Sequence, residues 1–379
     1  MKPRLHLALP AIALAALACS TTPDPSGPSA AATSRPSIFD SGRTAYGFFP
    51  SAPEPSLFSI LETFRGLGRH ADVILVQPNI AWEDFIDSPD TESQRITDIL
   101  NQEILADQNG LEIILVVDPL NGLNRREFAG LPPDLAQADF GTPDVREAYL
   151  NFTLRVVREL RPSYLGLASE INTYADAFPD DFPNFLSLYR ETYAAVKAES
   201  PETQVFVTFQ WEDLNNLIPT ATEGRGAYQT NWDQVEAFEP ELDLWVISSY
   251  PFAVFSSGAA IPSDYYTPLL ARTDKPLAVA EGGYISQPTG PFPGAPQDQV
   301  DYLNAIHQQI GDRLAFWIYL LFSDFDPESY ADLMRQEGQD DADIDTLGMF
   351  ASVGLQEVNG THKPAMAVWD GFRGVAADH

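Results

Sequence analysis

Eight short apolar runs, separated by longer amphipathic stretches, most strongly limit the folds open to this chain. Most of the runs are apolar on both faces, which is typical of parallel strands covered by helices. The runs are "TAYGFFP" (44–50), "DVILVQPN" (72–79), "LEIILVVDP" (111–119), "YLGLASEIN" (164–172), "TQVFVTFQW" (203–211), "LDLWVISSYPF" (242–252), "KPLAVAEGGY" (275–284) and "RLAFWIYLLF" (313–322).

The stretches between these runs have helical periodicity. In "TPDVREAYLNFTLRVVRELRP", Thr142 is a candidate cap and Pro143 stands at the first helical position, ahead of apolar residues at helical spacing. Eight strand–helix units in one chain predict an α/β fold, a single-domain (β/α)8 TIM barrel over residues 43–379. A doubly wound open sheet is the alternative. Its dinucleotide-binding form is disfavoured because no glycine-rich phosphate loop follows the first run.

The start of the chain has the pattern of an export signal. "MKPRLHLALPAIALAALACS" has a basic beginning and an apolar stretch that ends in small residues before Cys19. We predict a lipoprotein-type signal peptide over residues 1–18, because "ALAC" resembles a bacterial lipoprotein box. Residues 19–42 are predicted to be the lipidated cysteine and a flexible Ser/Pro/Ala linker. We expect an exported protein, lipid-anchored at Cys19 to the outer membrane or surface of a bacterial cell. The alternative is an ordinary signal peptide that contains a cysteine.

Charge and composition exclude several function classes. The formal net charge is −32, with 54 Asp and Glu against 22 Lys and Arg. Nucleic acid is excluded as a partner, because binding phosphates requires clustered Lys and Arg. No pair of histidines has zinc-ligand spacing, and we expect neither a metal nor a cofactor. Calcium binding by the acidic run "DDADID" (340–345) is left open, although a solvated loop is preferred because the run lacks the glycine placement of an EF-hand.

Two glutamates end strands of the predicted barrel. Glu170 ends the fourth run, and Glu281 ends the seventh, before two glycines where the chain can turn sharply. Burying an unpaired carboxylate is costly, so each is expected to have a partner or a function. Function gathers at the C-terminal ends of barrel strands, where these side chains can face each other. Such a pair suits glycoside hydrolysis, in which one carboxyl protonates the leaving oxygen and the other attacks.

The order of these parts resembles that of the retaining glycoside hydrolases of clan A. A Glu ends the fourth strand, "SSYPF" with Tyr250 follows the sixth, a Glu ends the seventh and Trp317 lies in the eighth. "SSYPF" and "AEGGY" look most like the endo-β-1,4-galactanases, with β-mannanase-type barrels second. The resemblance implies that Glu170 is the acid/base and Glu281 the nucleophile. It also implies that Tyr250 positions the nucleophile and that Trp317 floors the sugar subsite.

One position departs from the pattern of the clan. Many members have Asn before the acid/base glutamate, where it hydrogen-bonds the sugar 2-hydroxyl, but this chain has Ser169. Other candidate substrate-binding residues follow strand ends. Aromatic rings can stack on sugar rings, and polar side chains can bind hydroxyls. These candidates are Trp82, Trp211 and Tyr284 for stacking, and Asn79, Asp118, Gln210 and Glu212 for hydroxyls.

We therefore predict a retaining glycosidase that cleaves a β-linked plant-type or microbial polysaccharide or oligosaccharide, with β-1,4-galactan as first candidate. The alternative is a catalytically inactive glycan-binding barrel lipoprotein, which Ser169 favours. A barrel enzyme of other chemistry, such as a lyase, is a third interpretation. Two findings would count against hydrolysis: a separation of the two carboxylates above about 10 Å, or the burial of either one against an arginine.

Overall fold

The computed structural model describes residues 37–218, 226–336 and 341–374. The predicted signal peptide, Cys19 and most of the predicted linker lie outside these ranges. Asp340 of the acidic run 340–345 also lies outside them. Within the described ranges, no helix combines the length and the hydropathy needed to cross a bilayer.

The main sheet is a closed barrel of parallel strands. In chain order its members are β1 (Ala45–Phe49), β2 (Val73–Val76), β3 (Glu112–Val116), β6 (Tyr164–Gly166), β7 (Gln204–Phe206), β8 (Thr208–Gln210), β9 (Trp245–Ser249), β10 (Leu277–Gly282) and β11 (Leu314–Leu321). β7 and β8 flank Val207 within one run. Because β7 pairs with β6 while β8 pairs with β9, this run closes the ring. The predicted (β/α)8 barrel is confirmed, and the open-sheet alternative is wrong.

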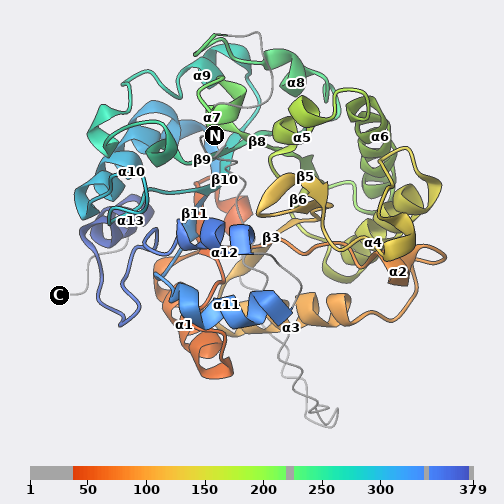
Figure 1. The fold of residues 1–379 in the computed structure, drawn as a ribbon, viewed down its shortest axis with the longest axis horizontal. Coiled ribbons are helices and arrows are strands. Elements are labelled where there is room, and N and C mark those ends of the chain that lie inside the picture. The colour runs from red at the N-terminus through yellow and green to blue at the C-terminus, as the bar shows by residue number, and fades with distance from the viewer. Residues whose placement is uncertain (1–36, 219–225, 337–340, 375–379) are drawn as a thin grey trace.

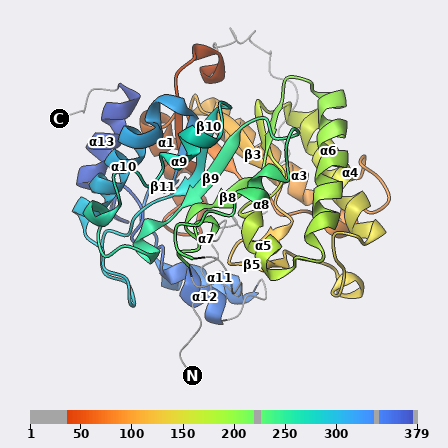
Figure 2. The ribbon, with the colours of Figure 1, turned by 90° about the horizontal axis from the view of Figure 1, so that it is seen from above.

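Helices surround the barrel (Figures 1 and 2). They are α1 (Leu57–His70), α2 (Trp82–Phe85), α3 (Gln94–Gln108), α4 (Pro143–Leu160), α5 (Ile171–Ala177), α6 (Phe182–Glu199), α7 (Trp211–Leu214), α8 (Trp232–Glu236), α9 (Pro268–Arg272), α10 (Pro296–Ile310), α11 (Pro327–Gln336), α12 (Asp341–Gly348) and α13 (Pro364–Arg373). Short 3₁₀ turns span Ile38–Ser41, Pro133–Leu135, Pro251–Ala253, Gly258–Ala260 and Gly311–Arg313. Thr142 and Pro143 begin α4 as expected, although the Thr142 hydroxyl donates to Asp139 instead of capping the helix.

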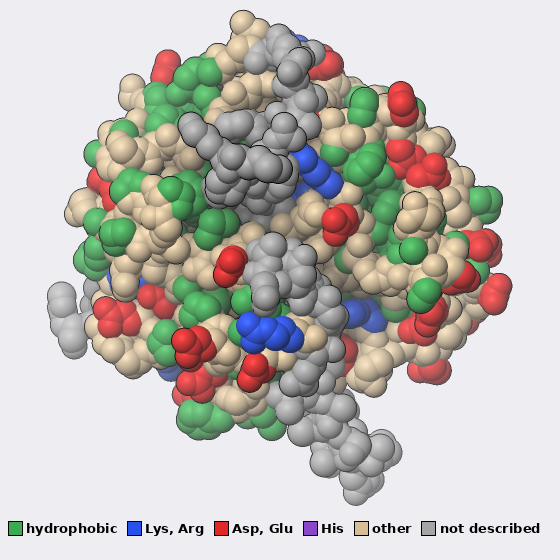
Figure 3. Space-filling view, in the orientation of Figure 1, with side chains coloured by type: hydrophobic (Ala, Val, Ile, Leu, Met, Phe, Trp, Pro, Cys, Tyr) green, Lys and Arg blue, Asp and Glu red, His purple; other side chains and the backbone are tan. Residues whose placement is uncertain are grey.

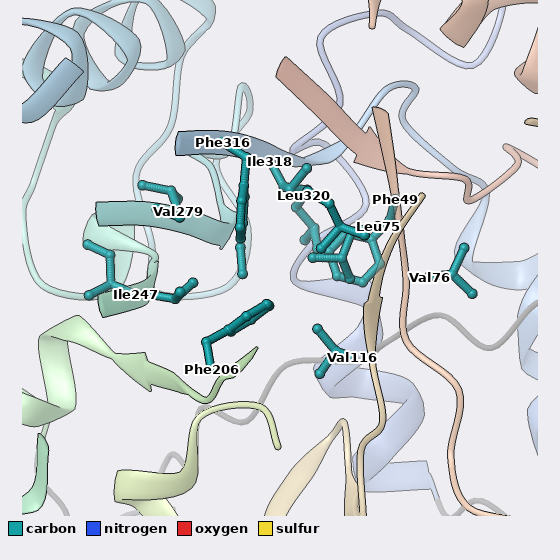
Figure 4. Packing of buried hydrophobic residues seen from close by; sticks show 14 of the residues in the cluster. Phe49, Leu75, Val76, Val116, Phe206, Ile247, Val279, Phe316, Ile318 and Leu320 are labelled. Carbon is teal, nitrogen blue, oxygen red and sulfur yellow. The ribbon is translucent and has the colours of Figure 1, made fainter. Parts of the chain in front are cut away.

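Large apolar side chains fill the barrel (Figure 4). Phe316 of β11 meets Phe206 of β7 with ring centroids 5.7 Å apart, and Ile318 and Leu320 follow it at alternate positions along the strand. Because successive strand residues point to opposite faces, Trp317 points away from this interior. Because apolar side chains fill this interior, polar chemistry is left to the ends of the barrel.

A small hairpin is inserted between β3 and α4. β4 (Leu120–Asn121) and β5 (Asn124–Phe128) pair antiparallel around a two-residue turn, Gly122 and Leu123. The figures place β5, α5, α7, α11 and α12 at the same end of the barrel, the end where the parallel strands finish. Acidic side chains are spread over this face, with few Lys and Arg among them (Figure 3).

Candidate active site

Glu170 and Glu281 both lie buried at this end of the barrel, with 0% and 1% of their surface exposed. Glu170 precedes α5 and has a left-handed backbone (φ +49°), an unusual conformation for a residue with a side chain. Glu281 lies within β10, next to a register shift between Val279 and Glu281. The sharp turn that the two following glycines allow is not formed there, because β10 continues through Gly282. Gly282 is instead required by close packing, since a Cβ there would lie 2.2 Å from the Tyr302 hydroxyl.

Arg125 of the hairpin reaches into the barrel and pairs with three carboxylates. Its Nε donates to Glu170 Oε2 at 3.2 Å, its Nη2 lies 3.6 Å from Glu281 Oε1, and its Nη1 donates to Asp118. Nε and Nη2 belong to the same edge of the guanidinium, so the nearest oxygens of Glu170 and Glu281 lie within about 9 Å of each other. The first finding that would count against hydrolysis is therefore absent, whereas the second, burial against an arginine, is present for both glutamates.

Hydroxyl groups complete the environment of each glutamate. Glu281 accepts hydrogen bonds from Ser169 Oγ at 2.9 Å and from the Tyr250 hydroxyl at 3.3 Å. Glu170 accepts one from Ser248 Oγ, and its own backbone N–H donates to Thr208 Oγ1 at 2.8 Å. Residues that end four different strands thus converge on the pair, as they do at the functional end of a barrel.

The charges of this cluster do not balance if all its groups ionise. Three carboxylates, those of Asp118, Glu170 and Glu281, surround one guanidinium in a buried site. Burial raises the pKa of Glu170, and burial together with the charge of Glu170 raises the pKa of Glu281 to about 8, against the opposing effect of Arg125. Both shifts favour retention of a proton on the glutamate pair near neutral pH.

A second buried network lies beside the first, around Glu212. Its carboxylate accepts from Ser249 Oγ and Gln210 Nε2, both at 2.7 Å, and from the Tyr250 backbone N–H at 3.0 Å. Burial raises the pKa of Glu212. Gln210 and Glu212, which we expected to bind sugar hydroxyls, instead satisfy each other and fix the segment that carries Tyr250.

The predicted role of Trp317 as the floor of the sugar subsite is wrong. Trp317 lies on the outer face of β11, where its ring packs against Trp369 and Phe372 of α13 at 5.5 and 5.9 Å. Strand alternation assigns the interior to Phe316 and Ile318 instead. Trp317 therefore belongs to the layer between barrel and helix.

The three residues proposed for stacking are also buried, so none presents a ring face to a ligand. Trp82 donates to the Ala129 carbonyl at 2.6 Å, and Tyr284 donates to the Phe255 carbonyl at 3.0 Å. Trp211 packs 6.0 Å from Trp232. These large aromatic residues follow strand ends as the sequence indicates, but they fill the space beneath the loops.

Asp118 and Asn79 serve the site indirectly. Asp118 is fully buried and accepts from Gln77 Nε2 at 2.8 Å as well as from Arg125. Asn79 donates to the backbone carbonyls of Asp118 and Leu120. Both residues support the guanidinium and its hairpin, and the fully buried Asp118 is not open to a sugar hydroxyl.

The sequence analysis missed Arg125 and Ser248. The available signal for Arg125 was the dipeptide Asn-Gly at 121–122. This dipeptide predicts a hairpin directly after a barrel strand, which places "NRREF" (124–128) at the functional end. Ser248 lies in the quoted "SSYPF" motif. Among the described residues, no group of three or more His, Cys, Asp and Glu side chains has the arrangement of a metal site.

Comparison with known proteins finds similarity in three-dimensional structure. No protein-family model matches the chain, and a search of curated proteins finds no match. Among solved structures, the GH5_18 protein from Bifidobacterium longum subsp. longum is similar with a TM-score of 0.61 and 14% identity, over 89% of this chain and 81% of that one.

Two further structures are similar. For an exo-β-1,4-mannosidase from Opitutaceae bacterium strain TAV5, the TM-score is 0.59 and the identity 15%, over 88% of this chain but only 59% of that one. For a structure of fungal β-1,4-galactanases the TM-score is 0.52 and the identity 14%, over 87% and 95% of the two chains. At this identity the likeness establishes the fold: the chain has the (β/α)8 barrel on which the clan A glycoside hydrolases are built.

Proposed function

We propose that the protein is a retaining glycoside hydrolase that cleaves a β-linked glycan, with Glu281 as nucleophile and Glu170 as acid/base. One observation carries this proposal: glutamates from β10 and from the segment after β6 meet at one guanidinium edge, with hydroxyl donors on Glu281. Their separation of at most about 9 Å lies within the range that glycoside hydrolysis uses. The similar mannosidase and galactanase structures support the same reaction class.

The two glutamates divide the chemistry between them. In the first step, a Glu281 oxygen bonds to the anomeric carbon while the bond to the leaving oxygen breaks, and Glu170 gives its proton to that oxygen. In the second step, water gives a proton to Glu170 and its oxygen displaces Glu281 from the sugar. Ser169 and Tyr250 both donate to Glu281, which favours its ionised, nucleophilic form and so opposes the burial and the charge of Glu170 that raise the pKa of Glu281.

For the substrate, we propose a neutral β-1,4-linked galactan or mannan. The net charge of −32 and the acidic side chains on the mouth face disfavour an anionic polymer. The mannosidase and galactanase among the similar structures support these two polymers.

Glycan binding without turnover is the second candidate, and Arg125 is the observation that favours it. A guanidinium that pairs with both glutamates stabilises their ionised forms and so weakens Glu170 as an acid. Both side chains are also buried in the absence of a ligand. A binding protein requires neither a proton on Glu170 nor access for water.

The deciding experiment measures reducing-sugar release from β-galactan, β-mannan, xylan and β-glucan, at low and high salt. Wild type is compared with Glu281→Gln and Glu170→Gln, and with Glu103→Gln on α3 as a control remote from the site. Hydrolysis of one polymer that only the two site variants lose supports the proposal. Proton NMR of the first product then reports whether the β configuration is retained. Binding of a polymer in an affinity gel without release of sugar would instead establish the second candidate.

We also propose that the chain is a lipoprotein anchored at Cys19. The support is the sequence pattern of residues 1–19 and the Ser/Pro/Ala-rich composition of the stretch that follows it. Expression in a bacterial host, followed by fractionation and mass spectrometry of the N-terminal peptide, tests it. Wild type should be found in membranes with acylated Cys19, and Cys19→Ser should not. Unmodified wild-type protein in the soluble fraction would contradict the proposal.

A further inference from the structure

Arg125 has no step of its own in the proposed mechanism, although it contacts both glutamates. We propose that Arg125 is a positioning residue, which aligns Glu170 with Glu281 and supplies a positive charge that faces both carboxylates. This inference rests on the proposed hydrolytic function and assigns a residue that controls it.

The nitrogens of the guanidinium pair with different carboxylates. The Nε–Nη2 edge, which commonly binds one carboxylate through both nitrogens, is here shared by Glu170 and Glu281. The remaining nitrogen, Nη1, pairs with Asp118. Asp118 is itself held by Gln77 Nε2 at 2.8 Å and by the Leu120 N–H at 3.2 Å. Asp118 therefore orients the guanidinium, and the guanidinium aligns the two glutamates.

The hairpin that carries Arg125 is anchored on both sides. Ala129 donates its N–H to the Pro119 carbonyl at 2.9 Å and accepts from Trp82 Nε1 at 2.6 Å. The Phe128 ring packs 4.6 Å from that of Phe140. Aromatic packing and hydrogen bonds therefore fix the base of the hairpin, from which β5 carries Arg125 into the site.

The charges facing the pair explain why one cation is decisive. Asp118 lies on the β3 side, Asp213 on the β8 side and Tyr250 on the β9 side. Burial and the nearby carboxylates raise the pKa of Tyr250, so its hydroxyl stays neutral. In the part of the chain that the structure describes, Arg125 is the only cation in ion-pair contact with Glu170 or Glu281. Without it, both glutamates would hold protons to higher pH.

The first test compares the pH profiles of kcat/KM for wild type, Arg125→Met and Arg125→Lys on the hydrolysed polymer. Arg126→Met, on the same hairpin, is the matched control. Loss of the charge should move both limbs of the Arg125→Met profile to higher pH by about one unit or more. The Lys variant keeps the charge but loses the shared edge, so its profile should stay near that of wild type at a lower rate. An unshifted profile for Arg125→Met would overturn the proposal.

A second test is independent of hydrolysis and so separates this inference from the proposed function. Carboxyls with raised pKa make the folded state bind more protons than the unfolded state, so stability falls as pH rises. The Tm deficit of Arg125→Met relative to wild type should therefore grow from pH 5 to pH 8. A deficit that is constant over this range would show a packing role only, whether or not any polymer is cleaved.

If Arg125→Met does not fold, the double variant Arg125→Met/Glu170→Gln replaces it in the stability test. This variant removes one cation and one carboxylate, so it should fold, and its Tm should fall more steeply with rising pH than that of Glu170→Gln alone, because Glu281 has lost its cation. A double variant that stays unfolded at pH 5, or whose Tm falls with pH no more steeply than that of Glu170→Gln, would overturn the proposal, because charge would then not be the cause.

Discussion

Ser169 Oγ donates a 2.9 Å hydrogen bond to Glu281 Oε1, so the residue before the proposed acid/base is tied directly to the proposed nucleophile. A hydroxyl has a single proton to donate. Ser169 therefore does not donate to a sugar hydroxyl at the same time, as the amide of an Asn is free to do. The departure from the clan pattern changes this position from a substrate contact into a support for Glu281.

Ser169→Ala should lower kcat/KM by about 10- to 100-fold, the effect of losing a hydrogen bond to a charged group. The loss should appear mainly in kcat, because the donor stabilises the ionised nucleophile and does not touch the sugar. Steady-state kinetics on the hydrolysed polymer measures it. An increase in KM with unchanged kcat would instead assign Ser169 to substrate binding.

Tyr250→Phe should reduce kcat/KM about 10-fold, since the 3.3 Å contact to Glu281 Oε2 is longer than that of Ser169. Tyr266→Phe is the matched control. Its hydroxyl contacts Ser249 at 2.9 Å and is bonded to neither glutamate of the pair. Equal losses in the two variants would show that the effect comes from packing and not from the bond to the nucleophile.

Wild-type stability should fall as pH rises from about 5 to 8. Burial raises the pKa of Asp324 to about 6, of Asp213 to about 7 and of Glu281 to about 8. For carboxyls with raised pKa, the stabilisation is complete below the unfolded-state pKa and is lost as pH passes through the folded-state values. Calorimetric Tm values at constant ionic strength measure this trend. The Tm of Glu281→Gln should decline less steeply than that of wild type. An identical decline would show that the pKa of Glu281 is not raised in the folded protein.

Lys363→Met should destabilise the fold by about 3–5 kcal/mol, because it leaves Asp324 buried without its cation. The Lys363 ammonium lies 2.7 Å from Asp324 Oδ1 and donates to Ser286 Oγ at 2.7 Å. Chemical denaturation measures the change, and adding Asp324→Asn should recover part of it. The exposed pair of Arg65 and Glu62 offers a control, where Arg65→Met should cost under about 1 kcal/mol.

The sequence predicted the barrel well because its signals are local. Each strand run carries its own apolar pattern, and Glu170 and Glu281 follow from counting strand ends. Side-chain direction and loop packing are not local. Trp317 is adjacent in sequence to the inward-facing Phe316. A difference of one position along the strand therefore places the Trp317 side chain outside the barrel, against α13. The pairing of Arg125 with Glu170 depends on how an inserted hairpin folds back over the barrel, which no pattern within either segment specifies.

The left-handed backbone at Glu170 has a consequence for any effort to engineer this protein. Glycine adopts a φ of +49° without the steric penalty of about 1–2 kcal/mol that an L-residue carries there. Glu170→Gly would also remove a buried carboxylate whose pKa burial raises. In a screen for heat resistance alone, relief of this backbone strain would favour glycine, against the loss of the buried ion pair with Arg125 and of the packing of the side chain. Position 170 needs to be held constant in such a screen, or activity needs to be selected alongside stability.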